Sequence, residues 1–184
     1  MRIACCTAAL ALVCAVSGPA AAQTPSLPTP GPEHAVFKAE EGTWDASIEM
    51  TAPGAPAMPP AKGVQVDTVG CGGMCLTTEV KAELMPGMPF EGRGLTTYDP
   101  AKKKYVGSWS DSMAPGLSLS EGTYDAAAHK STSWMEGPDM TGKMTKTKSV
   151  TEQVDADHKV MTMFTVGADG KELPTMKISY TRKK

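Results

Sequence analysis

The sequence predicts an all-β protein, an antiparallel up-and-down β-barrel of about ten strands, and three observations support this. Apolar and polar residues alternate with a period of two in GTWDASIEM (42–50) and MKISYTRK (176–183), which indicates strands with one buried face. Turns that begin with Asp recur between such segments, as in YDPAKKKY (98–105) and YDAAAHKS (124–131). No segment has the pattern of a long crossover helix, so the strands are expected to be antiparallel.

The segments before the barrel are assigned in chain order. Residues 1–22 combine Arg2, a short apolar run and Ala20-Ala21-Ala22, which is the pattern of a cleavable signal peptide. The protein is therefore expected to be secreted or periplasmic. Residues 23–33 form a Pro-rich linker, and a β-barrel domain over 34–184 follows it. The domain is expected to begin with one or two helical turns over 34–41.

The strands are placed by alternation and by the turns between them. Two successive segments, FEGRGLTTYDPAKKKYVGSWSDSM (90–113) and SEGTYDAAAHKSTSWMEGPDM (120–140), share the order Glu-Gly, Thr-Tyr-Asp, turn and Trp, which indicates consecutive hairpins. A meander of many short strands either closes or splits into two sheets, since exposed strand edges invite aggregation, and the closed barrel is the form expected here. The expected strands are 42–50, 62–70, 75–84, 89–98, 104–112, 117–125, 131–137, 144–154, 158–166 and 173–182.

The first expected strand carries a motif known from other barrels. Gly42-Thr43-Trp44 resembles the Gly-x-Trp signature of lipocalins and other calycins. The resemblance implies that Trp44 packs across the closed end of the barrel beneath a basic side chain from the last strand. Arg182 stands on that strand, and a guanidinium stacks well on an indole ring. Trp44 and Arg182 are therefore expected to form a structural pair.

A wider resemblance covers about Glu41 to Arg182. It rests on EGTWDASIEM, GMPFEGRGLTTYDPAKKKYVGSWSDSM, SEGTYDAAAHK, DMTGK and ISYTRK. Together these segments are similar to the secreted bacterial family known as domain of unknown function 1579. The resemblance implies a lipocalin-like barrel and supplies no activity.

Composition and motifs exclude several classes of function. The net charge is −2 and no basic stripe is present, so a nucleic-acid partner is not expected. The apolar run in the leader is too short for a membrane span. The sequence contains neither a Gly-x-Ser-x-Gly elbow nor a His-Glu-x-x-His motif, and we expect a protein that is not an enzyme.

Cys71 and Cys75 lie four residues apart within VGCGGMC (69–75). The glycines suit a tight turn, and a chain bound for an oxidising compartment favours a disulfide between the two cysteines. A metal site and a redox pair remain alternatives. A zinc site would need two more ligands, and a redox pair would favour a C-x-x-C motif at the start of a helix.

Thirteen methionines are the other unusual feature of the chain. Pairs recur at short spacing, as in DMTGKM (139–144) and MTM (161–163), and a thioether is a soft ligand that selects Cu(I). Methionine more often fills irregular gaps in a core, so no metal site and no cofactor is assigned. The three histidines, His34, His129 and His158, are expected to be exposed and to bind no metal.

The expected function is non-covalent binding of a small, largely apolar ligand inside the barrel, since barrels of this size leave room for one small molecule. The candidate ligand-binding residues are Trp109, Trp134, Met161 and Met163. Two alternatives stay open. One is a copper-binding periplasmic protein that uses methionine thioethers, and the other is a barrel filled by its own side chains with a structural or interaction role. No protein partner is identified.

Overall fold

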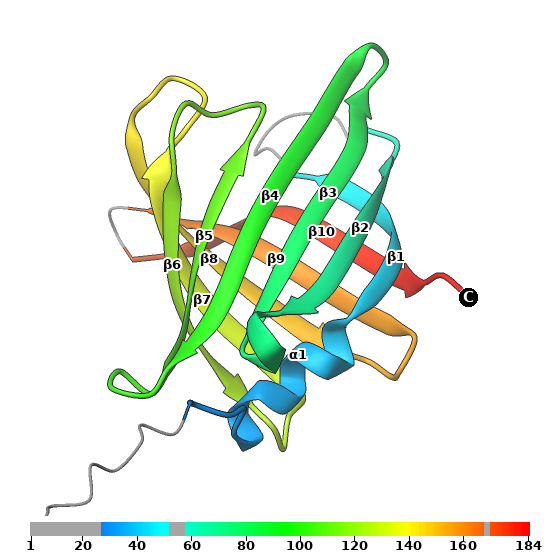
Figure 1. Cartoon of the computed structure of the whole chain (residues 1–184). Helices are drawn as coiled ribbons and strands as arrows, with labels where there is room; N and C mark the ends of the chain where they lie inside the picture. The colour runs from blue at the N-terminus through cyan, green and yellow to red at the C-terminus, as the bar shows by residue number, and fades with distance from the viewer. Residues whose placement is uncertain (1–26, 52–57, 168–169) are drawn as a thin grey trace, which may run out of the picture.

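The computed structural model describes residues 27–51, 58–167 and 170–184. The expected signal peptide, the first residues of the linker and residues 52–57, between the first two expected strands, lie outside the described residues. Ten antiparallel strands follow one another around a closed barrel, in which β1 and β10 pair with each other (Figure 1). The all-β barrel expected from the sequence is confirmed. The strands are β1 (Gly42–Met50), β2 (Ala61–Gly70), β3 (Cys75–Met85), β4 (Met88–Asp99), β5 (Lys104–Asp111), β6 (Ser118–Asp125), β7 (Lys130–Pro138), β8 (Met144–Gln153), β9 (His158–Val166) and β10 (Glu172–Arg182).

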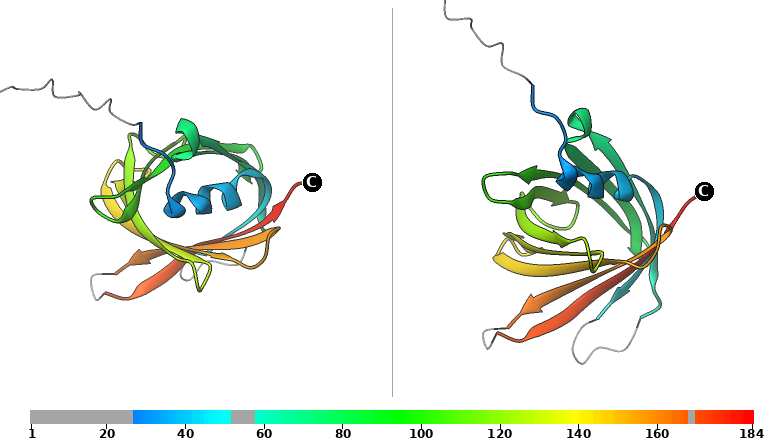
Figure 2. Two further views of the ribbon diagram at one scale, coloured as in Figure 1. Left: turned by 60° about the horizontal axis from the view of Figure 1, so that its bottom comes forward. Right: turned by 90° about the horizontal axis from the view of Figure 1, so that it is seen from below.

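Two short helical elements precede the barrel. A 3-10 turn, η1 (Pro32–His34), leads into α1 (Ala35–Glu40), and α1 lies across one end of the barrel (Figure 2). Phe37 is the buried residue of α1. We call the end of the barrel covered by α1 the floor. We call the opposite end, where the β3–β4, β5–β6 and β7–β8 connections lie, the mouth.

The turns at the floor end use the chemistry that the sequence predicts. The Asp99 carboxylate accepts hydrogen bonds from the amides of Ala101 and Lys102, and Asp125 does the same for Ala127 and Ala128. A carboxylate that binds the backbone two or three residues ahead fixes the turn and leaves the next strand in register. The two hairpins that repeat in the sequence are therefore built in the same way.

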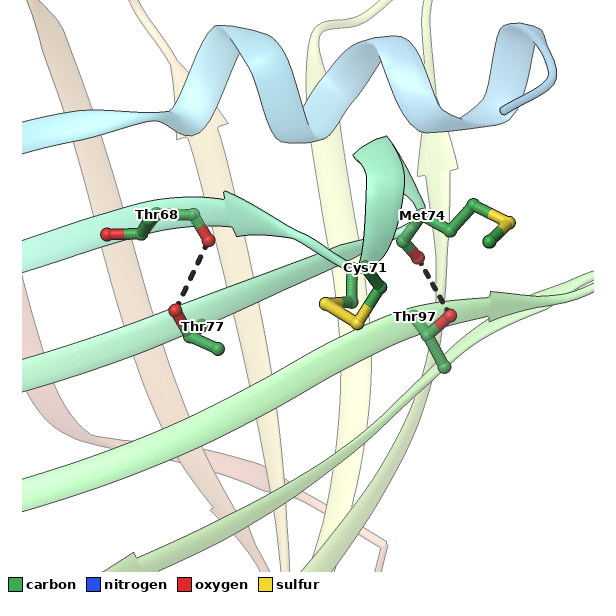
Figure 3. Close-up of a disulfide and its surroundings, with 6 residues drawn as sticks. Thr68, Cys71, Met74, Thr77 and Thr97 are labelled. Carbon is green, nitrogen blue, oxygen red and sulfur yellow. Dashed lines mark hydrogen bonds between the residues drawn. A yellow bond between two sulfur atoms is a disulfide. The ribbon is translucent and has the colours of Figure 1, made fainter. Parts of the chain in front are cut away.

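A third turn at this end contains the two cysteines. Cys71 and Cys75 form a disulfide that brackets a 3-10 turn, η2 (Cys71–Gly73), between β2 and β3. Gly72 has φ 65° and Gly73 has φ 95°, conformations that glycine adopts without penalty. In Figure 3 the disulfide lies below α1, and the Thr97 hydroxyl donates to the Met74 carbonyl at 2.9 Å. The disulfide expected from the sequence is confirmed, and its place is a turn beside the floor.

The buried core lies on one side of the barrel rather than at its centre. Trp44, Ala46 and Ile48 on β1 face Ile178 and Tyr180 on β10, and all five are buried. The register pairs Trp44 with Arg182 and Ile48 with Ile178. This packed seam closes the barrel, because it holds the first and last strands together.

Among the described residues, no helix has both the length and the apolar character needed to cross a membrane.

Candidate functional site: the barrel cavity

The barrel encloses a cavity of about 480 Å³. It runs along the barrel from α1, which contributes Phe37 and Glu40, to Phe90 and Asp111 near the mouth. A cavity of this size lies within the range of about 300–1,000 Å³ that is typical of small-molecule sites. The interior of the barrel is therefore not completely filled by its own side chains.

Exposure differs among the side chains that line the cavity. Next to the floor, Asp67, Leu76 and Lys159 are buried, whereas Tyr105, Tyr124 and Ser131 are partly exposed. Lining side chains near the other end, such as Phe90 and Trp109, are partly exposed. Since α1 covers the floor (Figure 2), a ligand is expected to enter and leave between the loops at the mouth.

Small residues on the inner faces of β4 to β8 create this space. Gly92 and Gly94 alternate along β4, and the Trp109 ring lies against both: a Cβ on Gly92 would approach Trp109 Cζ2 to 2.2 Å. Gly122 on β6 and Ser133 on β7 are register partners that line the cavity. With large side chains at these positions the ring could not pack there and the volume would be filled.

Three of the four candidate ligand-binding residues line the cavity. Trp109, Met161 and Met163 contribute to its wall, and the Trp109 indole nitrogen donates to Asp111 at 2.8 Å. The placement of Trp134 in the cavity is wrong. Its neighbours Ser133 and Met135 point inward, so Trp134 points to the outer face.

Trp134 is stabilised where it lies. The ammonium groups of Lys146 and Lys148 lie 5.4 Å and 5.9 Å from its ring centroid. Cations at this distance attract the face of an indole ring. The prediction that Trp134 binds the ligand rested on its residue type. The alternation of side chains along β7 places it on the outer face of the barrel.

The floor contains a buried charged group that the sequence did not reveal. Lys159 on β9 is 3 % exposed and pairs with Glu40 of α1 and with Asp67 of β2. The Glu40 side chain is partly buried by this pairing. The Asp67 carboxylate also accepts hydrogen bonds from Gln65 at 2.7 Å and Thr78 at 2.6 Å. Hydrogen bonds of this kind compensate for the loss of water around a buried ion pair.

Trp44 lies on β1 near the floor, and two cationic side chains lie over its ring. Arg182 Cζ lies 3.9 Å from its ring centroid, which is the arrangement that the sequence predicts, and Lys159 Nζ lies 4.2 Å from it. The Trp44 indole nitrogen donates to the Glu40 carbonyl at 2.9 Å. The Arg182 guanidinium donates to the carbonyls of Ala39 and Glu41 at the end of α1. These contacts fix α1 across the floor.

Two tyrosines near the floor have perturbed acidity. Burial raises the pKa of Tyr180 above its usual range, and the nearby Asp67 and Glu40 charges add to the rise. Burial also raises the pKa of Tyr105, whose hydroxyl donates to the Glu33 carbonyl at 2.7 Å. Both phenols are therefore neutral near neutral pH.

Some methionines lie on the surface and others in the cavity wall. Met140 and Met144 are 68 % and 65 % exposed near the mouth, whereas Met161, Met163 and Met176 line the cavity. In the described part of the chain, no three side chains of the His, Cys, Asp and Glu types form a group suited to a metal ion. His129 and His158 are exposed, but His34 is not. It packs against Phe37 and Tyr98, because the N-terminal turn folds onto the floor.

Comparison with known proteins gives the family. Residues 29–182 match the model of the family described as "Protein of unknown function (DUF1579)", and the chain belongs to this family. None of the curated proteins matches the sequence.

Solved structures show related barrels. The chain is similar to Rv2717c from M. tuberculosis, with 11 % identity and a TM-score of 0.62 over 84 % of this chain and 99 % of that one. It is also similar to the S-type phycobiliprotein lyase CPES from Guillardia theta, with 11 % identity and a TM-score of 0.55 over 82 % of this chain and 92 % of that one. At such low identity the likeness shows the fold alone.

Proposed function

We propose that the protein is exported and binds a small, largely apolar ligand non-covalently in the barrel cavity. The observation that carries the proposal is the cavity itself, about 480 Å³ in volume and lined on one side by Ile48, Met161, Met163 and Ile178. Transfer of apolar surface from water to such a wall is favourable by roughly 25 cal/mol per Å². Export is inferred from the leader-like residues 1–22, and the disulfide suits an oxidising compartment.

The lining supports binding of ligands whose shape varies. Methionine side chains are flexible and polarizable, so they adjust to the outline of a ligand more readily than branched side chains do. Trp109 adds a flat apolar surface held by its hydrogen bond to Asp111. The lyase similar in fold is named for an action on phycobiliproteins. The role proposed here is binding rather than catalysis. The Asp111 carboxylate lines the cavity, but it already accepts hydrogen bonds from the Trp109 indole and from the amides of Met113 and Ala114, so it is not available as a catalytic acid or base.

The test is a binding titration with a fluorescent apolar probe, N-phenyl-1-naphthylamine. Ser149 on β8 lines the cavity, so Ser149→Phe fills it. The control is Thr162→Phe, because Thr162 on the neighbouring strand β9 alternates with Met161 and Met163 and points outward. We expect the wild-type protein and the Thr162→Phe control to bind the probe, and Ser149→Phe to bind it at least tenfold more weakly. Equal affinity in all three proteins would contradict binding in the cavity.

A second candidate function, Cu(I) binding, is supported by one observation. Met163 on β9 and Met176 on β10 are register partners, and Met161 lies two residues from Met163 on the same face. Three thioethers on one wall suit a soft cation. Titration with Cu(I) under reducing conditions separates the two candidates. Sub-micromolar binding that is lost in the Met161→Leu, Met163→Leu double variant favours copper, and probe binding without copper binding favours the apolar ligand.

A further inference from the structure

We propose that the ligand is two-sided, with its hydrogen-bonding groups along one edge and an apolar remainder. This inference rests on the proposed function, since it describes the ligand of the same cavity. The structure supports it through an uneven division of the cavity wall. Three adjacent strands contribute most of the small hydroxyl side chains, and away from the charged floor the strands beside and opposite them contribute mostly apolar side chains.

The hydroxyl-bearing part of the wall lies on β6, β7 and β8. Its members are in register across the sheet: Ser133 pairs with Ser149, and Ser131 pairs with Thr151. The Ser133 and Ser149 hydroxyls hydrogen-bond each other at 2.7 Å. Met135 interrupts this surface towards the mouth. The hydroxyl wall, as we name it, consists of Ser120, Ser131, Ser133, Thr147, Ser149 and Thr151.

Four hydroxyls of this wall have capacity for a ligand. In the part of the chain that the structure describes, the side chains of Ser120, Ser131, Thr147 and Thr151 make no hydrogen bond to protein. All four are partly exposed, so water reaches them in the free protein. A ligand that displaces this water without replacing its hydrogen bonds leaves polar groups unsatisfied, which is costly. The hydroxyl wall therefore favours a ligand edge that carries donors or acceptors.

Most of the remaining wall has the opposite preference, apart from Thr96 on β4 and the polar side chains near the floor. It contains Ile48, Val80, Met161, Met163, Met176 and Ile178, from β1, β3, β9 and β10. A hydroxyl or carbonyl of the ligand placed against these side chains loses its water and gains no strong partner. Polar groups on opposite ends of a ligand are thus disfavoured, and polar groups on one edge are accepted.

Two isomers test this directly. Naphthalene-2,3-diol has both hydroxyls on one edge of the ring system, whereas naphthalene-2,6-diol has them at opposite ends. The isomers share size and composition, so the ratio of their affinities isolates the placement of the polar groups. We expect the wild-type protein to bind the 2,3-isomer about tenfold more tightly, which corresponds to the burial of one unsatisfied hydroxyl.

The matched variants keep the shape of the cavity. Ser131→Ala, Thr147→Val and Thr151→Val together remove three unpaired hydroxyls with little change in volume, and Thr162→Val makes the same change on the outer face. The preference for the 2,3-isomer is expected to fall to less than about twofold in the triple variant and to persist in Thr162→Val.

Equal affinities in the wild-type protein, or a preference that persists in the triple variant, would overturn the two-sided ligand and leave cavity binding intact. Failure of both diols and of plain naphthalene to bind would overturn the proposed function, and this inference with it.

Discussion

Replacement of Lys159 by methionine tests the account of the floor. Lys159 is 3 % exposed, and its ammonium pairs with Glu40 and, at 3.3 Å, with Asp67. Methionine has a similar length and is apolar, so the packing against Trp44 and Tyr180 is largely kept. The change removes the cation and leaves two carboxylates close together, of which Asp67 is 2 % exposed.

The cost follows from the burial of the pair. Removal of one partner of a buried ion pair destabilises a protein by about 3–5 kcal/mol, because the remaining charge is uncompensated. For a chain of this length 1 kcal/mol shifts Tm by about 2–4 °C, so we expect Tm to fall by roughly 6–20 °C. Asp67 keeps its hydrogen bonds from Gln65 and Thr78, which places the expected loss towards the lower limit.

The assays are thermal unfolding, which gives Tm, and urea unfolding followed by tryptophan fluorescence, which gives the free energy of unfolding, with a compensated variant as the control. Glu40→Gln and Asp67→Asn, added to Lys159→Met, remove the excess negative charge, and we expect them to restore at least half of the lost free energy of unfolding. A loss below about 1 kcal/mol for Lys159→Met would refute the buried pair as a stabilising unit. So would a triple variant that is no more stable than the single one.

Three further predictions concern other contacts of the floor. Arg182→Lys keeps the charge but loses most of the donors to α1, and thermal unfolding should show a loss of about 1–2 kcal/mol; an unchanged Tm would mean that the guanidinium does not hold α1. The Cys71→Ser, Cys75→Ser double variant should lose only about 1–2 kcal/mol of the free energy of unfolding, because the loop that the disulfide closes is short, and it should still bind the probe. Loss of probe binding would show that the disulfide shapes the cavity. Because the pKa of Tyr180 is raised by burial, its contribution to stability is complete below the unfolded-state pKa near 10 and is lost as the pH rises further. Unfolding of Tyr180→Phe between pH 8 and 12 should therefore show a weaker alkaline decline than the wild-type protein, and parallel curves would contradict the assignment.

The fold was predictable because its signals are local. Every expected strand agrees with the observed one to within one residue at each end, as for 75–84 against Cys75–Met85 and 117–125 against Ser118–Asp125. Period-two alternation and Asp-initiated turns depend on neighbours in sequence, so they are visible without coordinates. The stacking of Arg182 on Trp44 was expected from the resemblance to the Gly-x-Trp motif, and the two residues are register partners.

The site was less predictable because it depends on which face each residue takes and on contacts distant in sequence. Trp134 was assigned to the cavity by residue type, although the alternating serines Ser131 and Ser133 mark the inner face of β7. The same small-residue alternation, in EGRG and STSW, would have located the cavity. The pairing of Lys159 with Glu40 joins residues 119 positions apart and leaves no local signal.

The methionines allow the most direct test of the central claim, that the cavity binds an apolar ligand. The methyl groups of methionine can be labelled with ¹³C and followed by NMR while naphthalene-2,3-diol is added. We predict that the resonances of the cavity residues Met161, Met163 and Met176 shift, and that those of the exposed Met140 and Met144 do not. Shifts confined to Met140 and Met144, or no shift at any methionine at saturating ligand, would contradict the claim.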